Sequence, residues 1–370
     1  MNSNRLFQKF CRDRNIKSST RKGYDSALTL YEDFNGKTIE ELFTEARFEE
    51  NERIPLKKRK IKKRLIDFRT YLLNSKLSPN TSKTYFSKVK TFYLHFEFEL
   101  PHLPQAKYDK IYETNYLDLP TREHIHEALL ISPIDLKAVI LFMSSSGTAK
   151  AETLSLTVEH FIQGTQEYHH GGSIEFILET IDKKTNVVPT FYLKRIKTEK
   201  YYYTFCSPEA SSAIIKYLKT RENLKLEDPL FDFTSSLLLT RFQEINDKMN
   251  WGFKGKYRFF RSHTLRKFHA SNIGLSAEYI DSLQGRSKNE VHETYIKTNP
   301  KKLKDIYKSA MKNVMIYENK KQEIKKQEFT IVVNVFLSGK ELNIIYIFLR
   351  RLTLRVLEPS FLISIFWNFA

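Results

Sequence analysis

Cysteine is almost absent from this sequence of 370 residues, which contains only Cys11 and Cys206. Two cysteines cannot hold together a secreted scaffold of this size, and they form no CxxC or Cys/His pattern for a metal ion. We therefore expect a reduced, cytoplasmic setting. No run of 18 apolar residues occurs, which argues against a membrane-spanning helix. The first 15 residues are polar and charged, so we expect no signal peptide there.

Acidic residues are also fewer than basic ones. The chain has 61 Lys and Arg against 43 Asp and Glu, a net charge of +18, and its pI is about 9.5. Hydrophobic residues make up 41% of the chain, enough for real cores, so wholesale disorder is excluded. A pI this high is typical of nucleic-acid binders, although anionic membranes also attract basic proteins. The length suggests two or three domains.

The first hundred residues have a helical and strongly basic pattern. Two segments, 18–24 and 78–85, each place Ser/Thr caps and a Thr-xxx-Tyr spacing ahead of a periodic apolar run. This pattern predicts two helix starts with buried stripes, and Pro79 suits a first turn. Between them, residues 53–64 (RIPLKKRKIKKR) carry eight Lys or Arg side chains. Such a run can be a solvated surface, but the overall charge favours contact with phosphates.

A change of composition follows at residues 101–117, which contain Pro101 and Pro104 and are predicted to be a linker. Beyond it, residues 135–144 are predicted to form an apolar helix. The sequence Ser207-Pro208-Glu209 predicts a helix start, with a serine cap, proline in the first position and an acid in the first turn.

Three β-rich runs lie within this second part, at residues 174–180, 189–196 and 201–205. The last two are joined by the polar turn 197–200, which predicts a hairpin. The tail from about residue 329 is apolar without one clear period. It could be a partner-binding helix, a membrane-surface segment or a sequence with no selected fold, and its role stays open.

Four short clusters could carry chemistry. The first is 262–267 (SHTLRK), where a cap at Ser262 would put His263 and Arg266 on one face of a first helical turn. Helix N-termini attract anions, and a guanidinium donates two hydrogen bonds to a phosphate.

The second cluster is 284–290 (QGRSKNE), in which Ser287 and Glu290 form a capping-box pattern. Arg286 lies just before this predicted helix start, and Tyr295 follows nine residues later. In one unbroken helix nine residues turn by about 900°, which separates the two side chains. A break at Ser287 lets Arg286 fold back toward Tyr295.

The third cluster is the turn 197–200 (KTEK), which contains Lys197, and the fourth is 144–156 (SSSGTAKAETLSL), which contains Lys150 and Glu152. Taken singly, each of the four clusters is more common as a structural or solvated feature than as a site. Their order along the chain is the stronger signal.

In that order, SGxxKAExLSL, KTxK, HxLRKxxAS and GR with a tyrosine nine residues later, the clusters resemble the catalytic domain of the tyrosine recombinases, the phage integrase family. FCSPEA at 205–210 and LQGRSKN at 283–289 look closest to archaeal members. The resemblance covers about residues 118–312, and residues 1–100 are similar to the family's helical core-binding domain. It implies a mainly α fold with a small antiparallel sheet: a helical DNA-binding domain and an α+β catalytic domain. Residues 313–370 lie outside it.

The resemblance also implies roles by position. Tyr295 matches the nucleophile, His263 and Arg266 match the second-box pair, and Lys197 matches the hairpin lysine. Arg286 stands where many members have histidine and some archaeal ones have arginine.

The first box departs from the family. Its arginine falls two or three residues after the glycine, where this chain has Ala149 and Lys150. Glu152 fits the usual acidic position. Lysine keeps the positive charge but loses the planar two-donor fork of arginine, so we retain Lys150 as the candidate with a changed chemistry.

The implied function is site-specific DNA recombination through a 3′-phosphotyrosine, without metal, cofactor or ATP. The implied partner is double-stranded DNA with specific sites, bound by a homotetramer, and no membrane is involved. Two alternatives stay open. A non-catalytic DNA-binding relative is suggested by the missing first-box arginine and the unusual tail, and a type IB-like topoisomerase would use the same chemistry to relax supercoils.

Overall fold

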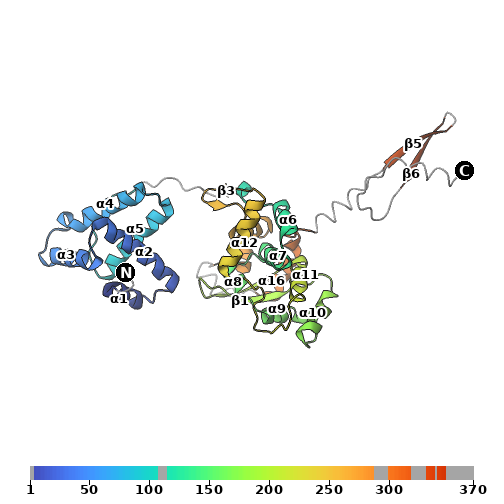
Figure 1. Ribbon diagram of the computed structural model, residues 1–370, viewed down its shortest axis with the longest axis horizontal. Coiled ribbons are helices and arrows are strands. Elements are labelled where there is room, and N and C mark those ends of the chain that lie inside the picture. The colour runs from blue at the N-terminus through green and yellow to red at the C-terminus, as the bar shows by residue number, and fades with distance from the viewer. Residues whose placement is uncertain (1–3, 107–114, 287–298, 318–330, 338–339, 347–370) are drawn as a thin grey trace. The chain divides into compact units, whose positions relative to one another are not determined.

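The computed structural model describes residues 4–106, 115–286, 299–317, 331–337 and 340–346. The chain divides into two compact units, Met1–Glu113 and Thr114–Ala370. Most described residues are helical and the strands form small antiparallel pairs, which confirms the predicted fold class (Figure 1).

The first unit is a helical bundle with an aromatic core. Its elements are α1 (Arg5–Asp13), α2 (Ser18–Asn35), α3 (Ile39–Asn51), the 3-10 turn η1 (Leu56–Lys58), α4 (Lys60–Asn74) and α5 (Pro79–His95). Helices α2, α4 and α5 pack on one another, and the buried hydroxyls of Tyr31 and Tyr93 lie 3.3 Å apart between α2 and α5. Aromatic side chains such as Phe10, Phe68 and Phe92 fill the core, where each contributes a large buried apolar area.

Both predicted helix starts in this unit are confirmed, because α2 begins at Ser18 and α5 begins at Pro79, but the predicted cap of α2 is corrected. The Ser78 side chain accepts a hydrogen bond from the Thr81 amide, and Pro79 is the first residue of α5, as predicted. The predicted Ser/Thr cap of α2 is wrong. That helix begins at Ser18, and Lys17 in the cap position makes no side-chain cap hydrogen bond.

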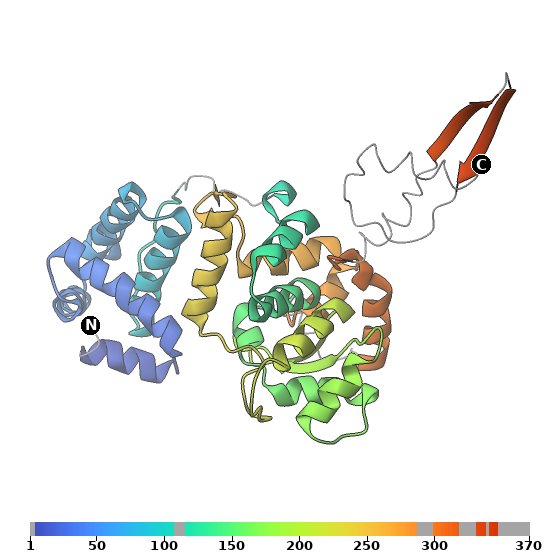
Figure 2. The same cartoon turned by 45° about the vertical axis from the view of Figure 1, so that its right-hand side comes forward.

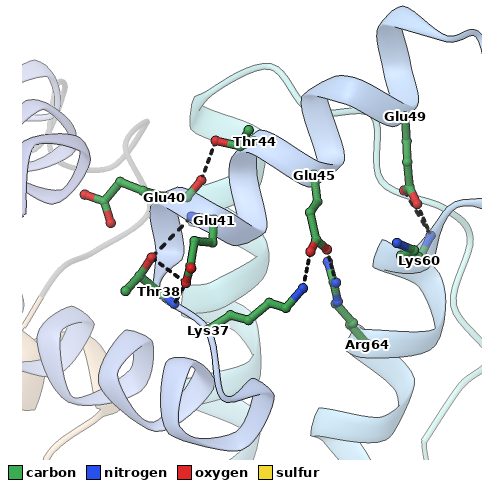
Figure 3. Close-up of polar contacts among 9 residues, drawn as sticks. All are labelled: Lys37, Thr38, Glu40, Glu41, Thr44, Glu45, Glu49, Lys60 and Arg64. Atoms are coloured by element: carbon green, nitrogen blue, oxygen red, sulfur yellow. Dashed lines mark hydrogen bonds and ion pairs between the residues drawn. The ribbon is translucent and has the colours of Figure 1, made fainter.

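Helix α3 is tied to α4 by acidic side chains (Figure 3). Glu45 forms ion pairs with both Lys37 and Arg64, and the Glu49 carboxylate accepts hydrogen bonds from the Lys60 amide at 3.0 and 3.2 Å. The second contact satisfies an amide at the start of α4 that has no partner within the helix.

The second unit contains the remaining elements. Its helices are α6 (Arg122–Ile131), α7 (Ile134–Ser146), α8 (Lys150–Leu154), α9 (Val158–Gly164), α10 (Ile174–Asp182), α11 (Pro208–Leu218), α12 (Ser235–Lys248), α13 (Ser262–Asn272), α14 (Ala277–Leu283) and α16 (Pro300–Ala310), with 3-10 turns η2 (Tyr116–Asp118), η3 (Gln166–Tyr168) and η4 (Met311–Asn313). Its strands are β1 (Thr190–Lys194), β2 (Tyr201–Phe205), β3 (Phe253–Lys254), β4 (Tyr257–Arg258), β5 (Ile331–Leu337) and β6 (Lys340–Tyr346).

Helix α7 is the centre of this unit. It is buried on every side, as expected of a helix that is apolar around its whole circumference. It packs against α11 and α13, and two views show it among the other helices (Figures 1 and 2). The predicted helix at 135–144 is therefore confirmed. Ser207 caps α11 by accepting from the Ala210 amide, and Pro208 is the first residue of that helix, also as predicted.

Strands β1 and β2 form the predicted hairpin, with Thr190 opposite Phe205 and Lys194 opposite Tyr201. The predicted β run at 174–180 is wrong, because these residues lie in α10. Ile174, Ile177, Leu178 and Ile181 recur at helical spacing. The Ser173 side chain caps the helix by accepting from the Phe176 amide at 3.3 Å.

The tail contains another antiparallel hairpin. Strands β5 and β6 pair antiparallel, with Ile331 opposite Tyr346 and Leu337 opposite Lys340. These two segments of the tail are therefore strands, and they do not form a partner-binding helix. Before the tail, Val314 and Ile316 are buried in the core of the second unit, and the Glu209 carboxylate accepts from the Ile316 amide at 2.7 Å. No described helix is both long and apolar enough to cross a membrane.

Candidate functional site

Helix α13 carries two of the predicted site residues on its first turn. It begins at Ser262, with Arg261 in the cap position, so the predicted Ser262 cap is wrong by one residue. Thr264 does the capping instead. Its hydroxyl accepts from the Arg261 amide at 3.1 Å and donates to the Arg261 carbonyl at 2.8 Å. His263 and Arg266 thus lie one turn apart at the start of α13.

Arg266 is buried, with only 6% of its surface exposed. Its Nη1 donates to the Gly147 carbonyl at 2.8 Å and its Nη2 donates to the Gln284 carbonyl at 2.9 Å. The guanidinium therefore joins the end of α7 to the end of α14. Burial and the nearby charges of Arg195 and Arg286 lower the pKa of Arg266 to about 10, so it stays cationic at neutral pH.

Both chain segments that Arg266 joins turn at a glycine with positive φ, +66° at Gly147 and +59° at Gly285. A Cβ on Gly147 would lie 2.6 Å from Nδ1 of His269, and a Cβ on Gly285 would lie 2.5 Å from the Tyr202 ring. Only glycine combines this backbone conformation with such close packing.

Gln284 and His269 are buried beneath the same turn. The Gln284 side-chain nitrogen donates to the Arg266 carbonyl at 3.1 Å and lies 3.0 Å from His269 Nδ1. A carbonyl can only accept, so this nitrogen is the amide donor and Nδ1 of His269 accepts. The imidazole proton is therefore on Nε2. Burial, followed by the charges of Arg266 and Arg286, lowers the pKa of His269 to about 3, so the ring is neutral.

Arg286 and His263 lie at the surface of the group formed by Arg266, His269 and Gln284. The Arg286 amide donates to the Asp281 carbonyl at 2.8 Å, and its side chain lies 3.6 Å from the Asp281 carboxylate. His263 is an exposed residue. Partial desolvation and the positive charges of its neighbours, Arg266 and Arg286 among them, lower the pKa of His263. The structure thus brings together three of the six predicted site residues: His263, Arg266 and Arg286.

The other predicted residues are placed differently. Lys197 lies at the exposed tip of the β1–β2 hairpin and makes no hydrogen bond or ion pair with the described residues. Lys150 is the first residue of α8, and its Nζ donates to the Ser235 carbonyl at 3.3 Å. Tyr295 lies outside the described residues, as do Ser287 and Glu290 of the predicted capping box.

Arg195 belongs to the group and was not predicted. It follows β1, and its Nη1 donates to the Gly285 carbonyl at 2.6 Å and to the Gln284 carbonyl at 3.3 Å. It is half-buried. The only signal in the sequence was its place two residues before Lys197, where an arginine at a strand end reads as a solvated charge.

Two buried polar side chains complete the group. Tyr202 on β2 and Glu152 on α8 are both buried, and no described residue forms a hydrogen bond with the Tyr202 hydroxyl or with Oε2 of Glu152. Burial and then the charge of Glu152 raise the pKa of Tyr202, while Arg266 and Arg195 act in the opposite sense. Among the described residues no three His, Cys, Asp or Glu side chains could hold a metal ion together.

The basic run of the first unit has two kinds of side chain. Arg59 pairs with Glu50 at 3.1 Å, and Arg64 pairs with Glu45; both arginines are mostly buried. Lys57, Lys58 and Lys63 are exposed and form no ion pair within the described part of the chain. The exposed members of the run therefore remain the candidates for contact with phosphates.

Comparison with known proteins gives structural similarity only. No protein-family model matches the chain, and no curated protein matches it in sequence. Among solved structures, the XerH site-specific recombinase bound to difH substrate is 16% identical, with a TM-score of 0.48 over 81% of this chain and 82% of that one. A lambda integrase dimer bound to a COC′ core site is 12% identical, with a TM-score of 0.49 over 78% of this chain and 92% of that one.

A third similar structure is the Tn1549 transposon integrase in complex with transposon right end DNA. It is 14% identical, with a TM-score of 0.43 over 83% of this chain and 97% of that one. All three identities are low and all three TM-scores are below 0.5, so the function of this chain has to be inferred from its own residues.

Proposed function

We propose that this chain is a site-specific DNA recombinase of the tyrosine recombinase type. The observation that carries the proposal is the gathering of His263, Arg266 and Arg286 around the turn that directly precedes the segment with Tyr295. Cationic groups at one turn suit a phosphate, and a tyrosine close by in sequence can supply a nucleophile.

In this proposal the two parts of the chain divide the work. Residues 1–100 bind the DNA duplex, residues 101–117 link, and residues 118–312 carry the chemistry, while the role of residues 313–370 stays open. The protein acts as a homotetramer on paired DNA sites. The net charge of +18 supports a DNA partner, because binding that neutralises phosphates releases counterions.

The proposed reaction conserves the bond energy of the DNA backbone. The Tyr295 phenolate oxygen attacks the scissile phosphorus, the bond from phosphorus to the 5′-oxygen breaks, and a 3′-phosphotyrosine forms. The departing 5′-oxygen takes a proton and becomes a free hydroxyl. Attack by another 5′-hydroxyl on the phosphotyrosine reverses these steps on a new strand, so no ATP is needed.

The remaining site residues are assigned to two tasks, the stabilisation of negative charge and the transfer of protons. Arg266, Arg286 and Lys150 hold the non-bridging oxygens as negative charge accumulates, and removal of one such donor typically costs about 2.7–4 kcal/mol. Lys197 protonates the leaving 5′-oxygen. His263, whose lowered pKa keeps its ring neutral at pH 7, assists proton transfer or orients the phosphate.

The test is a search for a covalent adduct between the full chain and nicked genomic DNA, in which the broken strand cannot rejoin. We expect a denaturant-resistant complex, and about 10²–10³-fold less of it with Arg286→Ala. Arg241→Ala is the matched control, because both arginines are exposed and each lies near a carboxylate, Arg241 at 2.9 Å from Glu244. The absence of any adduct with the wild-type chain would reject the proposal.

The second candidate is a DNA-binding relative that does not cut. It is favoured by the alanine and lysine that replace the first-box arginine, and by the contact of Lys150 with the Ser235 carbonyl. Such a protein binds DNA with a steep salt dependence and forms no adduct.

A further inference from the structure

We propose that Arg195 is a third guanidinium of the phosphate site and binds the phosphate together with Arg266 and Arg286. The identity of this phosphate as the scissile group of DNA rests on the proposed function. The binding of phosphate by these three side chains can be tested without any catalysis.

Arg195 and Arg266 share one hydrogen-bond acceptor. Both donate to the carbonyl oxygen of Gln284, Arg195 through Nη1 at 3.3 Å and Arg266 through Nη2 at 2.9 Å. A guanidinium has five N–H donors in a planar fork. Arg195 uses only Nη1 on the two carbonyls, so its Nε and Nη2 form no hydrogen bond with the described residues, and Nε is buried without any partner.

A purely structural role for Arg195 would not require its positive charge. A neutral amide could donate to the Gly285 carbonyl, whereas a second guanidinium repels Arg266 and is among the causes that lower the pKa of Arg266. Glu152 and Asp281 compensate only part of the positive charge of the three arginines. An anion that lies between the guanidinium groups would relieve this repulsion, and a planar fork suits two oxygens of a phosphate.

Unpaired buried polar atoms gather in the same place. Nine buried side-chain nitrogen or oxygen atoms of the described residues have no hydrogen-bond partner. Five of them belong to the group around the Gln284 turn: Glu152 Oε2, Arg195 Nε, Tyr202 Oη, His269 Nε2 and Gln284 Oε1. Buried polar groups in folded proteins are nearly always paired, and exceptions concentrate where water or a ligand is bound. This concentration supports a polar ligand site beside Arg195 and Arg266.

The experiment compares the melting temperature of the full chain in inorganic phosphate and in chloride at equal ionic strength. A ligand that binds the native state stabilises it by mass action, so the phosphate-dependent rise reports the dissociation constant. We expect the wild-type chain to be stabilised by phosphate. Arg195→Gln keeps a donor for the carbonyls but loses the charge, and should weaken phosphate binding by about tenfold or more. Arg195→Lys should keep part of the binding.

Arg221→Gln is the matched control, because Arg221 also donates Nη1 to a carbonyl, that of Pro229 at 2.6 Å, and does not belong to the group around Gln284. It should leave the phosphate effect unchanged. Equal stabilisation of wild type and Arg195→Gln would overturn the proposal, and so would the absence of any phosphate effect on the wild type. If Arg195→Gln does not fold, a phosphate effect of full size in Arg195→Lys would overturn it as well.

The adduct assay then separates this inference from the proposed function. If Arg195 binds phosphate and the wild type forms no DNA adduct, the proposed function fails while the phosphate site stands. If the wild type forms the adduct, Arg195→Gln should form it about 10²–10³-fold more slowly even at DNA concentrations that saturate binding. An adduct formed at the wild-type rate by Arg195→Gln would contradict a role for Arg195 at the scissile phosphate.

Discussion

Arg195 and Arg266 donate hydrogen bonds to the same main-chain oxygen, that of Gln284, although they come from a β-hairpin and from a helix start. The hairpin that carries Lys197 and the helix that carries His263 are therefore fastened to one turn. A movement of that turn changes the positions of both elements, so the proposed acid and the proposed phosphate ligands are coupled through the backbone of residues 284 and 285.

Substitution of Gly285 tests whether the turn needs its close packing. Gly285→Ala should lose about 1–2 kcal/mol from the left-handed backbone alone and a further 1–3 kcal/mol from overpacking against the Tyr202 ring. The free energy of unfolding in urea measures the loss. Gly252→Ala is the control, because Gly252 also has positive φ but nothing lies within 4 Å of its added Cβ. Equal losses in the two variants would show that packing against Tyr202 is unimportant.

The exposed lysines of the first unit should contribute to DNA affinity without affecting the chemistry. Lys57→Gln combined with Lys58→Gln should weaken binding to any duplex and reduce the slope of log K against log salt by about 0.9 for each lysine that contacts a phosphate. A filter-binding titration at several salt concentrations measures both. Lys183→Gln with Lys184→Gln provides a second adjacent, exposed pair in the other unit. The prediction fails if both double variants change the slope equally.

Glu45 should contribute an acid-sensitive part of the stability of the first unit. Its ion pairs with Lys37 and Arg64 lower the pKa of Glu45 to about 2. Because the folded pKa is depressed, this stabilisation is present above the unfolded pKa of about 4.5 and is lost as the pH falls toward 2. Glu45→Gln should therefore lower the melting temperature at pH 6 and flatten its fall below pH 4.5.

Glu40→Gln is the control for this pH profile, since Glu40 lies on the same helix and its carboxylate points away from Lys37 and Arg64 (Figure 3). Its variant should keep the wild-type slope. A Glu45→Gln profile parallel to the wild type below pH 4.5 would show that the two ion pairs do not stabilise the fold.

Lys150 distinguishes the active enzyme from a non-catalytic relative. With Arg195 supplying a guanidinium, Lys150→Arg should change the rate of adduct formation by less than about tenfold, which is less than the typical effect of one oxyanion donor. The rate is measured with the nicked DNA substrate. A wild-type chain that binds DNA without forming an adduct, together with a Lys150→Arg chain that forms one, would instead identify an impaired relative.

Much of the fold could be predicted because its signals are local. Proline in the first turn and a preceding serine marked α5 and α11, and an apolar run marked α7. The β1–β2 hairpin followed from two β-rich runs around a polar turn. The sequence of α10 predicts a strand because its β-branched residues favour strands. The spacing of three and four residues between its apolar side chains and the Ser173 cap instead stabilise a helix.

The site was predicted only in part, for a different reason. His263, Arg266 and Arg286 lie in short motifs whose order along the chain carries information. Arg195 joins them through contacts with carbonyls about ninety residues away, and no local pattern encodes such a contact. Gln284 lies within one of these motifs, but its hydrogen bond to His269 depends on the end of α14 reaching a buried side chain of α13.

The identity of the residue bonded to DNA tests the central claim most directly. After the wild-type adduct is trapped, nuclease and trypsin should leave a nucleotide on the peptide of residues 289–297, NEVHETYIK, and fragmentation in the mass spectrometer should assign it to Tyr295. Tyr295→Phe should bind DNA with unchanged affinity and form no adduct. A nucleotide attached to any other residue, or an adduct of wild-type yield from Tyr295→Phe, would contradict the account.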